Sequence, residues 1–515
     1  MKRRSVLAGG LAMAAVPARS WAAAAPEVQA PAGTFEGDAA GGVQRFLGIR
    51  YGIAPRFRAP APLAQPGVRV PAHAFGPVCP QRGQYKPQAE DCLYLNVWTP
   101  QANPSAKRPV MVYIHGGAYS NGSVTDPLND GATLAAAEDV VVVTVNHRLN
   151  ALGYLYLARF HADFADSGNL GQLDLIVALQ WVRDNIAAFG GDSRRVFVFG
   201  QSGGGAKIAT LMGMPAAKTL FHSAATMSGQ QVTASGPLNA TRRSQAYLAK
   251  LGVKETDLSP LLAMPTERLI EGLDTVDPIL GGGLYFGPVL DMKWLVRHPF
   301  WPDANPQSNA IPMILGNTHD ETRAFVSPDS QKVKGLTWDN LAAAMAPELR
   351  MDILPEWVVG QYRAHFPNDT PETIFYRATT AGRSWPGQVL EADARAAAGA
   401  KSTWVYQVDF QSPTRPDRGA PHTMDIALAF GTLGAEGSFT GTGPDARRLS
   451  AQMMAAFAAL ARTGRPVAKG VPAWPAYMLP HRATMVFDAA SRAVNDPRKW
   501  ERELFARVPY IQPGS

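Results

Sequence analysis

The sequence contains little cysteine and no strong excess of either charge. Two cysteines occur among 515 residues, and 49 basic residues are nearly balanced by 42 acidic ones. No dense block of lysine and arginine with interleaved aromatic residues is present, which excludes nucleic acid as a partner. A cysteine cluster and a His-x-x-x-His motif are also missing, so we expect neither a metal ion nor an organic cofactor.

Long hydrophobic runs are scarce as well, and the one near the N-terminus is too short to span a bilayer. Residues 6–16 are uncharged and apolar, follow basic residues at positions 2–4, and precede a small-x-Ala pattern that ends at Ala22. A membrane-spanning helix needs about 20 apolar residues. We therefore predict an export signal at residues 1–22, no membrane span, and a periplasmic or secreted mature protein.

Two export routes fit this signal. The Arg3-Arg4 pair followed by Ser5 resembles a twin-arginine signal, which exports folded proteins. An ordinary secretory signal with two neighbouring arginines is the alternative. Without the four basic residues of the signal, 45 basic residues remain against 42 acidic ones, and the net charge falls from +7 to +3.

The two cysteines, Cys79 and Cys92, lie thirteen positions apart. In an oxidising compartment this pair predicts a disulfide that closes a short loop and adds roughly 3 kcal/mol of stability. If the protein is exported in the folded state, both sulfur atoms must lie near the surface for the bond to form afterwards. Two buried free thiols are the alternative.

Apolar strand-like runs alternate with helical ones, which predicts an α/β protein with a mostly parallel central sheet and helices on both faces. The expected strands share a short apolar run, at residues 110–114, 140–145, 196–199, 313–315, 404–408 and 484–487. Apolar residues at helical spacing predict helices around residues 173–181 and 450–462. The long Pro- and Gly-rich stretches 229–310 and 323–400 are expected to pack over the carboxyl edge of the sheet.

One strand-to-helix junction carries a candidate nucleophile. Residues 196–199 are apolar and β-prone, Gly200-Gln201-Ser202-Gly203-Gly204 follows, and a helix-compatible run comes next. A sharp turn here would hold the Ser202 hydroxyl out of the sheet, and it requires small residues two positions before and after the serine. The first N–H groups of the following helix would be free to stabilise an oxyanion.

A second glycine pair follows the strand predicted to end at Ile114. His115-Gly116-Gly117-Ala118-Tyr119 allows backbone amides to turn inward without side-chain obstruction. A plain tight turn is the alternative. Together with the serine junction, the pattern predicts an oxyanion hole formed by the N–H groups of Gly117, Ala118 and Gly203.

Three stretches of the chain closely resemble carboxylesterase type B proteins, the α/β-hydrolases that include bacterial para-nitrobenzyl esterases and cholinesterases. They are Glu90-Asp91-Cys92-Leu93-Tyr94-Leu95-Asn96-Val97, residues 115–122, and residues 169–204. Weaker similarity continues to His422. The resemblance implies an α/β-hydrolase fold, with one catalytic domain over residues 23–515, and a serine–glutamate–histidine triad in that chain order.

The resemblance also assigns the other two members of the triad. The acid falls in the loop at residues 316–322, where the family's Asp-Glu pair places it at Glu321, with Asp320 as the alternative. The family's His-x-x-Glu pattern places the base at His422. From the residues alone His319 remains a competitor, because it neighbours the proposed acid.

Differences from the cholinesterases of the family narrow the range of expected substrates. Gln201 replaces the glutamate that precedes the nucleophile in cholinesterases, and residues 80–91 lack the tryptophan that binds quaternary ammonium there. Cationic choline esters are therefore not expected as substrates. Gly281-Gly282-Gly283 stands where cholinesterases carry bulky acyl-pocket aromatics. Our hypothesis is an acyl side open to acids larger than acetate, although a glycine hinge unrelated to the pocket explains the run equally well.

The sequence therefore predicts a serine hydrolase that cleaves a small-molecule carboxylic ester through an acyl-enzyme. Hydrolysis of another acyl bond, in an amide, lactone or thioester, is the alternative. A non-catalytic binding protein is a further one, since the family includes members that lost the nucleophile. Nothing in the sequence indicates the oligomeric state.

Overall fold

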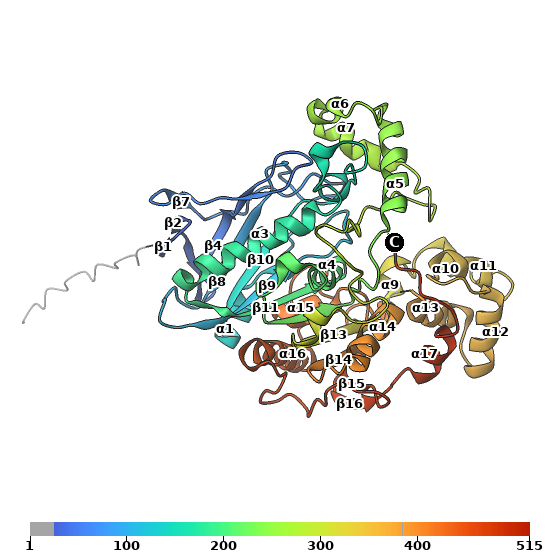
Figure 1. Ribbon diagram of the computed structural model, residues 1–515. Helices are drawn as coiled ribbons and strands as arrows, with labels where there is room; N and C mark the ends of the chain where they lie inside the picture. The colour runs from blue at the N-terminus through green and yellow to red at the C-terminus, as the bar shows by residue number, and fades with distance from the viewer. Residues whose placement is uncertain (1–24, 384, 515) are drawn as a thin grey trace, which may run out of the picture.

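The computed structural model describes residues 25–383 and 385–514. The predicted export signal at residues 1–22 lies outside the described residues. Figure 1 shows a large twisted sheet with helices on both sides, as the α/β prediction requires.

Among the described residues, the main sheet has eleven strands in the order β16-β15-β14-β13-β12-β11-β9-β10-β8-β4-β3. Its seven strands from β15 to β10 are parallel, whereas the pairs at the two edges are antiparallel. In sheet order the strands are β16 (Arg492–Asn495), β15 (Ala483–Phe487), β14 (Thr403–Val408), β13 (Met313–Thr318), β12 (Ser223–Met227), β11 (Gly191–Gln201), β9 (Arg108–Ile114), β10 (Val141–Val145), β8 (Tyr94–Thr99), β4 (Val43–Arg50) and β3 (Asp38–Ala40).

Two small sheets accompany the main one near the N-terminus. They consist of β1 (Glu27–Ala30), β2 (Gly33–Glu36) and β7 (Arg69–Pro71), and of β5 (Gly52–Ile53) and β6 (Ala61–Pro62). The predicted central strands are confirmed with shifts of a few residues at their ends. The antiparallel edge strands and the small sheets were not predicted from the sequence.

Alternating residues of the central strands build a separate core on each face of the sheet. In β9, Val110, Val112 and Ile114 pack with α3 and α4, whereas Met111 and Tyr113 pack with α15 and α16. The first face carries α2 (Asn150–Tyr154), α3 (Leu170–Asn185), α4 (Gly203–Leu211) and α14 (Trp385–Ala397), and the second α1 (Ala132–Glu138), α15 (Met424–Phe430) and α16 (Pro444–Thr463).

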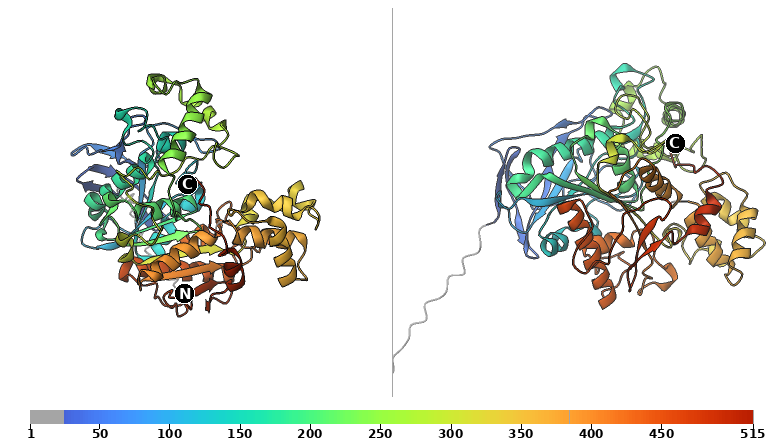
Figure 2. Two further views of the ribbon diagram at one scale, coloured as in Figure 1. Left: turned by 45° about the vertical axis from the view of Figure 1, so that its right-hand side comes forward. Right: turned by 60° about the horizontal axis from the view of Figure 1, so that its bottom comes forward.

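The two long insertions form helical lobes on one side of the sheet. Figures 1 and 2 show these lobes as separate groups of helices, with the C-terminus between them. The first lobe contains α5 (Pro237–Leu251), α6 (Ser259–Ala263) and α7 (Thr266–Glu271). The second contains α10 (Gln331–Lys334), α11 (Leu341–Met345), α12 (Pro355–His365) and α13 (Pro371–Ala381) from the insertion, and α17 (Lys499–Phe505) from later in the chain packs with them. Two short helices, α8 (Pro306–Asn309) and α9 (Thr322–Phe325), flank β13 in sequence.

The expected disulfide is absent, because Cys79 and Cys92 are both free thiols. Their exposed fractions are 2% and 0%, and both belong to the core on the α3 face. The Cys79 sulfur accepts a hydrogen bond from the N–H of Leu149 at 3.2 Å. A disulfide formed after export of the folded protein requires both sulfur atoms near the surface. Because both are buried in the core, that requirement is not met.

None of the helices within the described residues is long and apolar enough to cross a membrane.

Candidate active site

Ser202 occupies a strained turn between β11 and α4. Its backbone has φ 55° and ψ −125°, which a non-glycine residue adopts only when its surroundings impose it. The N–H of Ser202 donates to the carbonyl oxygen of Met227 at the end of β12 at 2.7 Å. The neighbouring strand therefore fixes the serine at the carboxyl edge of the sheet.

Small residues are required around this turn because three backbone segments meet there. A Cβ atom on Gly200 would lie 2.7 Å from the carbonyl oxygen of Ile114, and one on Gly204 would collide with the same oxygen. A Cβ atom on Gly203 would collide with the carbonyl of Ala118. The glycines that the sequence analysis singled out thus let β9, β11 and α4 approach one another.

His422 and Glu321 come together from two different loops. The Nδ1 atom of His422, just before α15, forms a hydrogen bond with Oε2 of Glu321, which directly precedes α9. The Nε2 atom of His422 has no hydrogen-bond partner among the described residues. His422 lines one cavity with Ser202 but forms no hydrogen bond with it, and such bonds often tighten only when substrate is bound.

Several donors hold Glu321 in its ionised form. Its Oε1 atom accepts hydrogen bonds from the Ser228 hydroxyl at 2.6 Å, the Thr318 N–H at 2.9 Å and the Asn317 amide at 3.2 Å. Burial by itself raises the pKa of Glu321, but His422 and these donors outweigh it and lower that pKa below its usual value. The sequence analysis missed Ser228, because a serine after a strand carries no distinctive signal.

The alternative acid and base lie beside each other, away from this pair. Asp320 lies 3.2 Å from His319 and accepts a hydrogen bond from the Ala420 N–H at 3.0 Å. His319 and Arg323 lower the pKa of Asp320 to about 2 although burial opposes this. The structure brings Glu321, and not Asp320, to His422.

A third carboxyl group, Asp425, stands in the first turn of α15 and accepts a hydrogen bond from the Tyr406 hydroxyl at 2.8 Å. Burial, with the nearby charge of Glu321, raises the pKa of Asp425 to about 7. Asp425 is therefore largely protonated in mildly acidic solution, which limits its repulsion with Glu321.

The predicted oxyanion residues lie on both sides of the Ser202 turn. Gly117 and Ala118 have φ angles of 84° and 52°, so this loop bends sharply after β9. Ala118 and Gly203 line the cavity that contains Ser202, whereas Gly117 lines a neighbouring cavity. The N–H of Gly203 has no acceptor within α4, because Gly203 is the first residue of that helix.

Lys207, which the sequence analysis did not single out, supports the loop from α4. Its ammonium group donates to the carbonyl oxygen of Ala118 at 2.7 Å and to that of His115 at 3.4 Å. Burial lowers the pKa of Lys207 to about 7.

The cavity around Ser202 and His422 has a volume of about 510 Å³, which suits a small organic ligand. One wall is the loop Gly281-Gly282-Gly283, where a side chain at any of the three positions would meet open space. Tyr285, Phe325, Arg350 and Arg383 also line the cavity.

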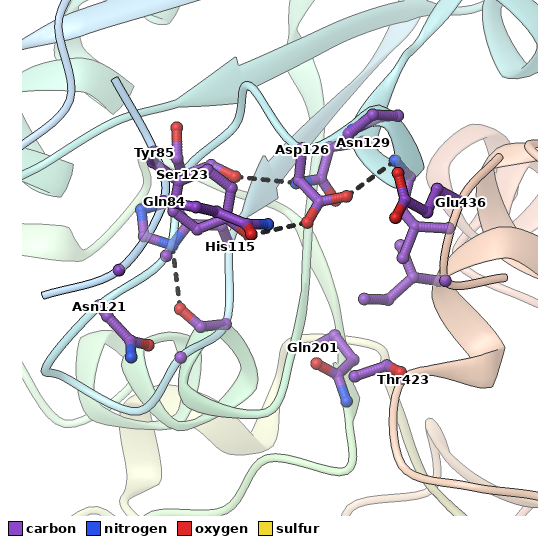
Figure 3. A pocket seen from close by; sticks show the side chains of 18 of the residues that line it. Gln84, Tyr85, His115, Asn121, Ser123, Asp126, Asn129, Gln201, Thr423 and Glu436 are labelled. Atoms are coloured by element: carbon purple, nitrogen blue, oxygen red, sulfur yellow. Dashed lines mark hydrogen bonds between the residues drawn. The ribbon is translucent and has the colours of Figure 1, made fainter. Parts of the chain in front are cut away.

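A second cavity of about 590 Å³ lies beyond the loop that carries Gly117, and Gln201 lines it. Figure 3 shows Gln201 and Thr423 among its side chains, together with Tyr85, whose hydroxyl donates to Asp126 at 2.8 Å. His115 is buried beside this cavity, and its burial lowers the pKa to about 3, so its imidazole is neutral at physiological pH. Within the part of the chain that the structure describes, no group of three or more His, Cys, Asp or Glu residues is arranged to hold a metal ion.

Comparisons with known proteins agree with this architecture. The sequence pattern of the Carboxylesterase family matches residues 24–502. The chain is 35% identical over 497 residues to the para-nitrobenzyl esterase of Bacillus subtilis (strain 168), covering 92% of this chain and 96% of that protein. It is 32% identical to the phenmedipham hydrolase of Pseudarthrobacter oxydans, covering 90% and 94%. The crystal structure of a Geobacillus stearothermophilus carboxylesterase superposes with a TM-score of 0.83 at 35% identity, covering 93% of this chain and 99% of that one.

Proposed function

Because the chain belongs to the carboxylesterase family and is a carboxylic ester hydrolase, we propose that Ser202 is its nucleophile. In this mechanism the Ser202 oxygen attacks the ester carbonyl, the alcohol leaves, and the acyl group remains on Ser202. Water then attacks the acyl-enzyme and releases the acid. The strained turn supports this role because it presents the hydroxyl at the edge of the sheet.

His422 acts as general base and then as general acid. Its Nε2 atom takes the proton of Ser202 and gives it to the leaving alcohol. In the second half of the reaction it takes a proton from the attacking water and returns it to the Ser202 oxygen. Glu321 receives the Nδ1 hydrogen bond, which fixes the tautomer and stabilises the imidazolium. The Ser228 hydroxyl positions Glu321 through its hydrogen bond.

The N–H groups of Gly117, Ala118 and Gly203 stabilise the negative oxygen of the tetrahedral intermediate. Removal of one such donor in a serine hydrolase lowers kcat by about 10²–10³-fold. The close approach of Ala118 to Gly203 supports a shared role for these two residues.

One observation carries the mechanism: His422 points its unpartnered Nε2 atom away from Glu321 and lines the same cavity as Ser202. Ser202→Ala is expected to lower ester hydrolysis by about 10⁴-fold or more. The measurement is kcat/KM for p-nitrophenyl esters of increasing acyl length and for one amide. Ser105→Ala, in an exposed loop, serves as the matched control.

A covalent probe separates the mechanism from a non-catalytic role. A fluorophosphonate should label Ser202 in the wild type and leave the Ser202→Ala variant unlabelled, as read by peptide mass spectrometry. Full ester activity in the alanine variant would exclude the mechanism. Faster cleavage of the amide than of every ester would favour the alternative acyl-bond specificity.

The substrate we propose is a small ester with an acyl group larger than acetate. Open space around Gly281, Gly282 and Gly283 supports this hypothesis. A strict preference for acetate across the ester panel would overturn it.

We propose further that the mature protein is periplasmic or secreted, because residues 1–22 have the composition of an export signal. Sequencing of the N-terminus of the protein from a periplasmic fraction tests this, and a retained Met1 would contradict it.

A further inference from the structure

Arg350 contributes a positive charge to the active-site cavity that no described residue neutralises. The backbone of Arg350 is fixed on both sides, since its N–H donates to Gly382 at 2.8 Å and its carbonyl accepts from Ile511 at 2.8 Å. Its side chain has no ion pair or hydrogen bond within residues 25–383 and 385–514, and its Nε atom is shielded from solvent without a partner. An unpaired, partly desolvated guanidinium costs free energy unless a ligand satisfies it.

A second arginine strengthens the positive potential. Arg383 lines the same cavity and pairs with Glu348 at 2.6 Å, an acid that also pairs with Lys332 at 3.0 Å. Burial and then the like charge of Arg350 lower the pKa of Arg383. Glu348 thus pairs with two cations, and Arg350 has no counter-charge among the described residues.

The other charged groups around the cavity do not compensate Arg350. Asp277 lines it but is buried in an ion pair with Arg243 at 2.7 Å and accepts N–H groups from its own loop. The carboxylate of Glu321 is engaged in its hydrogen bond with His422. Tyr285 and Tyr510 also line the cavity, and burial raises the pKa of Tyr285 to about 12, so this phenol is neutral.

The arginines lie within reach of a substrate held at the catalytic residues. The Phe325 ring lies 4.8 Å from the His422 ring and 4.5 Å from the guanidinium carbon of Arg383. One phenyl ring therefore separates His422 from Arg383, and a cavity of about 510 Å³ holds Arg350 together with Ser202.

We propose that Arg350 binds a carboxylate carried by the ester substrate, so that the enzyme prefers acidic esters such as monoesters of dicarboxylic acids. This inference rests on the proposed role of Ser202 and names the substrate class of the same site. Arginine suits the task because its planar guanidinium donates two parallel hydrogen bonds to a carboxylate. Arg383 adds electrostatic attraction for the substrate carboxylate while its ion pair with Glu348 stays formed.

The test compares charged and neutral esters of equal length. For an acyl-side carboxylate the pair is mono-p-nitrophenyl adipate and p-nitrophenyl hexanoate, and for an alcohol-side carboxylate it is 4-acetoxybenzoate and its methyl ester. The wild type should show the higher kcat/KM for the charged member of one pair, and that pair identifies which side of the ester carries the carboxylate.

Arg350→Gln should lower kcat/KM for that charged ester by about 10–100-fold, in line with a hydrogen bond to a charged group. It should leave the neutral esters within about twofold, and Arg350→Lys should recover part of the loss. Arg363→Gln removes an exposed cation from the same lobe and should change neither ester. Thermal unfolding of each variant confirms that it is folded.

Binding without turnover separates this inference from the mechanism. In the Ser202→Ala background, calorimetry should detect binding of the charged product of the preferred pair, free adipate for the acyl side or 4-hydroxybenzoate for the alcohol side, and Arg350→Gln should remove that binding. Equal rates for charged and neutral members of both pairs would overturn the inference, as would an equal loss on both in Arg350→Gln. If Ser202→Ala loses hydrolysis of every ester and Arg350→Gln does not, the loss in Ser202→Ala concerns the proposed mechanism and not the role of Arg350.

Discussion

At the scale of single residues, Asp425 is a buried carboxyl group whose charge the fold disfavours. Its unfolded pKa of about 3.8 rises to about 7 in the folded state. A group with a raised folded pKa contributes stability below its unfolded pKa, and that contribution is lost as the pH rises through the folded value. Asp425 therefore destabilises the protein progressively between about pH 4 and pH 7.

Asp425→Asn removes this charge and keeps an acceptor for the Tyr406 hydroxyl. We expect its free energy of unfolding, relative to the wild type, to improve by at least about 1 kcal/mol between pH 5 and pH 8. Denaturant unfolding at both pH values measures this. Asp352→Asn, at an exposed position, controls for the loss of a carboxylate, and a constant difference between Asp425→Asn and the wild type would contradict the expectation.

How far the sequence predicts a residue depends on whether its role is local. Ser202 and the adjoining glycines were predictable, because strand, turn and helix follow one another in the chain. Glu321 and Asp320 could be separated only by family resemblance, since neighbouring residues point to different partners. Ser228 and Arg350 were not predictable, because their partners and cavity come from distant segments.

The cysteine prediction was wrong for a similar reason. Spacing and compartment favour a disulfide between Cys79 and Cys92, but neither indicates that both side chains are buried in the core as free thiols. Burial is a property of the folded chain, and no short pattern around the two residues encodes it.

At the scale of elements, the junction of β11 and α4 depends on the absence of side chains. Gly204→Ala would place a methyl group against the carbonyl oxygen of Ile114, which belongs to the backbone of β9 and cannot rotate away. We expect a loss of about 1–3 kcal/mol in stability. We also expect a larger relative loss in kcat than in substrate binding, because Ser202 and Gly203 would shift. Unfolding midpoints and ester kinetics measure the two effects.

Gly360→Ala is the matched control, since Gly360 lies inside α12 and a Cβ atom there meets open space. That variant should keep its activity and gain up to about 1 kcal/mol, because alanine favours helix more than glycine does. Equal behaviour of the two alanine variants would show that the close approach at Gly204 does not matter.

The central strands were predictable because strands buried on both faces are almost entirely apolar, as β10 is apart from Thr144. The outermost antiparallel strands were not, because they are short and are not buried. β3 and β16, at the two ends of the sheet, have mostly exposed or half-buried residues, and such sequences resemble loops.

At the scale of the whole molecule, the second lobe has a hydrophobic core of its own. Phe375 is fully buried in it, together with Tyr362 from α12 and Phe505 from α17. The proposed catalytic residues lie in loops that follow strands of the main sheet, whereas Arg350 belongs to this lobe. Under the two proposals, substrate selection and catalysis depend on different cores.

Phe375→Leu should loosen the lobe more than the sheet. A smaller side chain in this core should cost about 1–3 kcal/mol locally and raise hydrogen exchange in α12 and α13. Exchange in β9 and β11 should stay slow. Hydrogen–deuterium exchange mass spectrometry measures this, and uniform acceleration across the lobe and the sheet would show one cooperative unit instead.

The last residues of the described chain close the space between the lobes. Ile511 donates to the carbonyl of Arg350, Gln512 accepts the N–H of Val232 at 3.0 Å, and Gly514 accepts from Arg243 at 2.9 Å. This short segment thereby links the strand-end loops, the first lobe and the second lobe by hydrogen bonds. An affinity tag fused after this segment would disturb the wall of the cavity that contains Ser202 and Arg350, so a tag is better placed on the N-terminal side of residue 25.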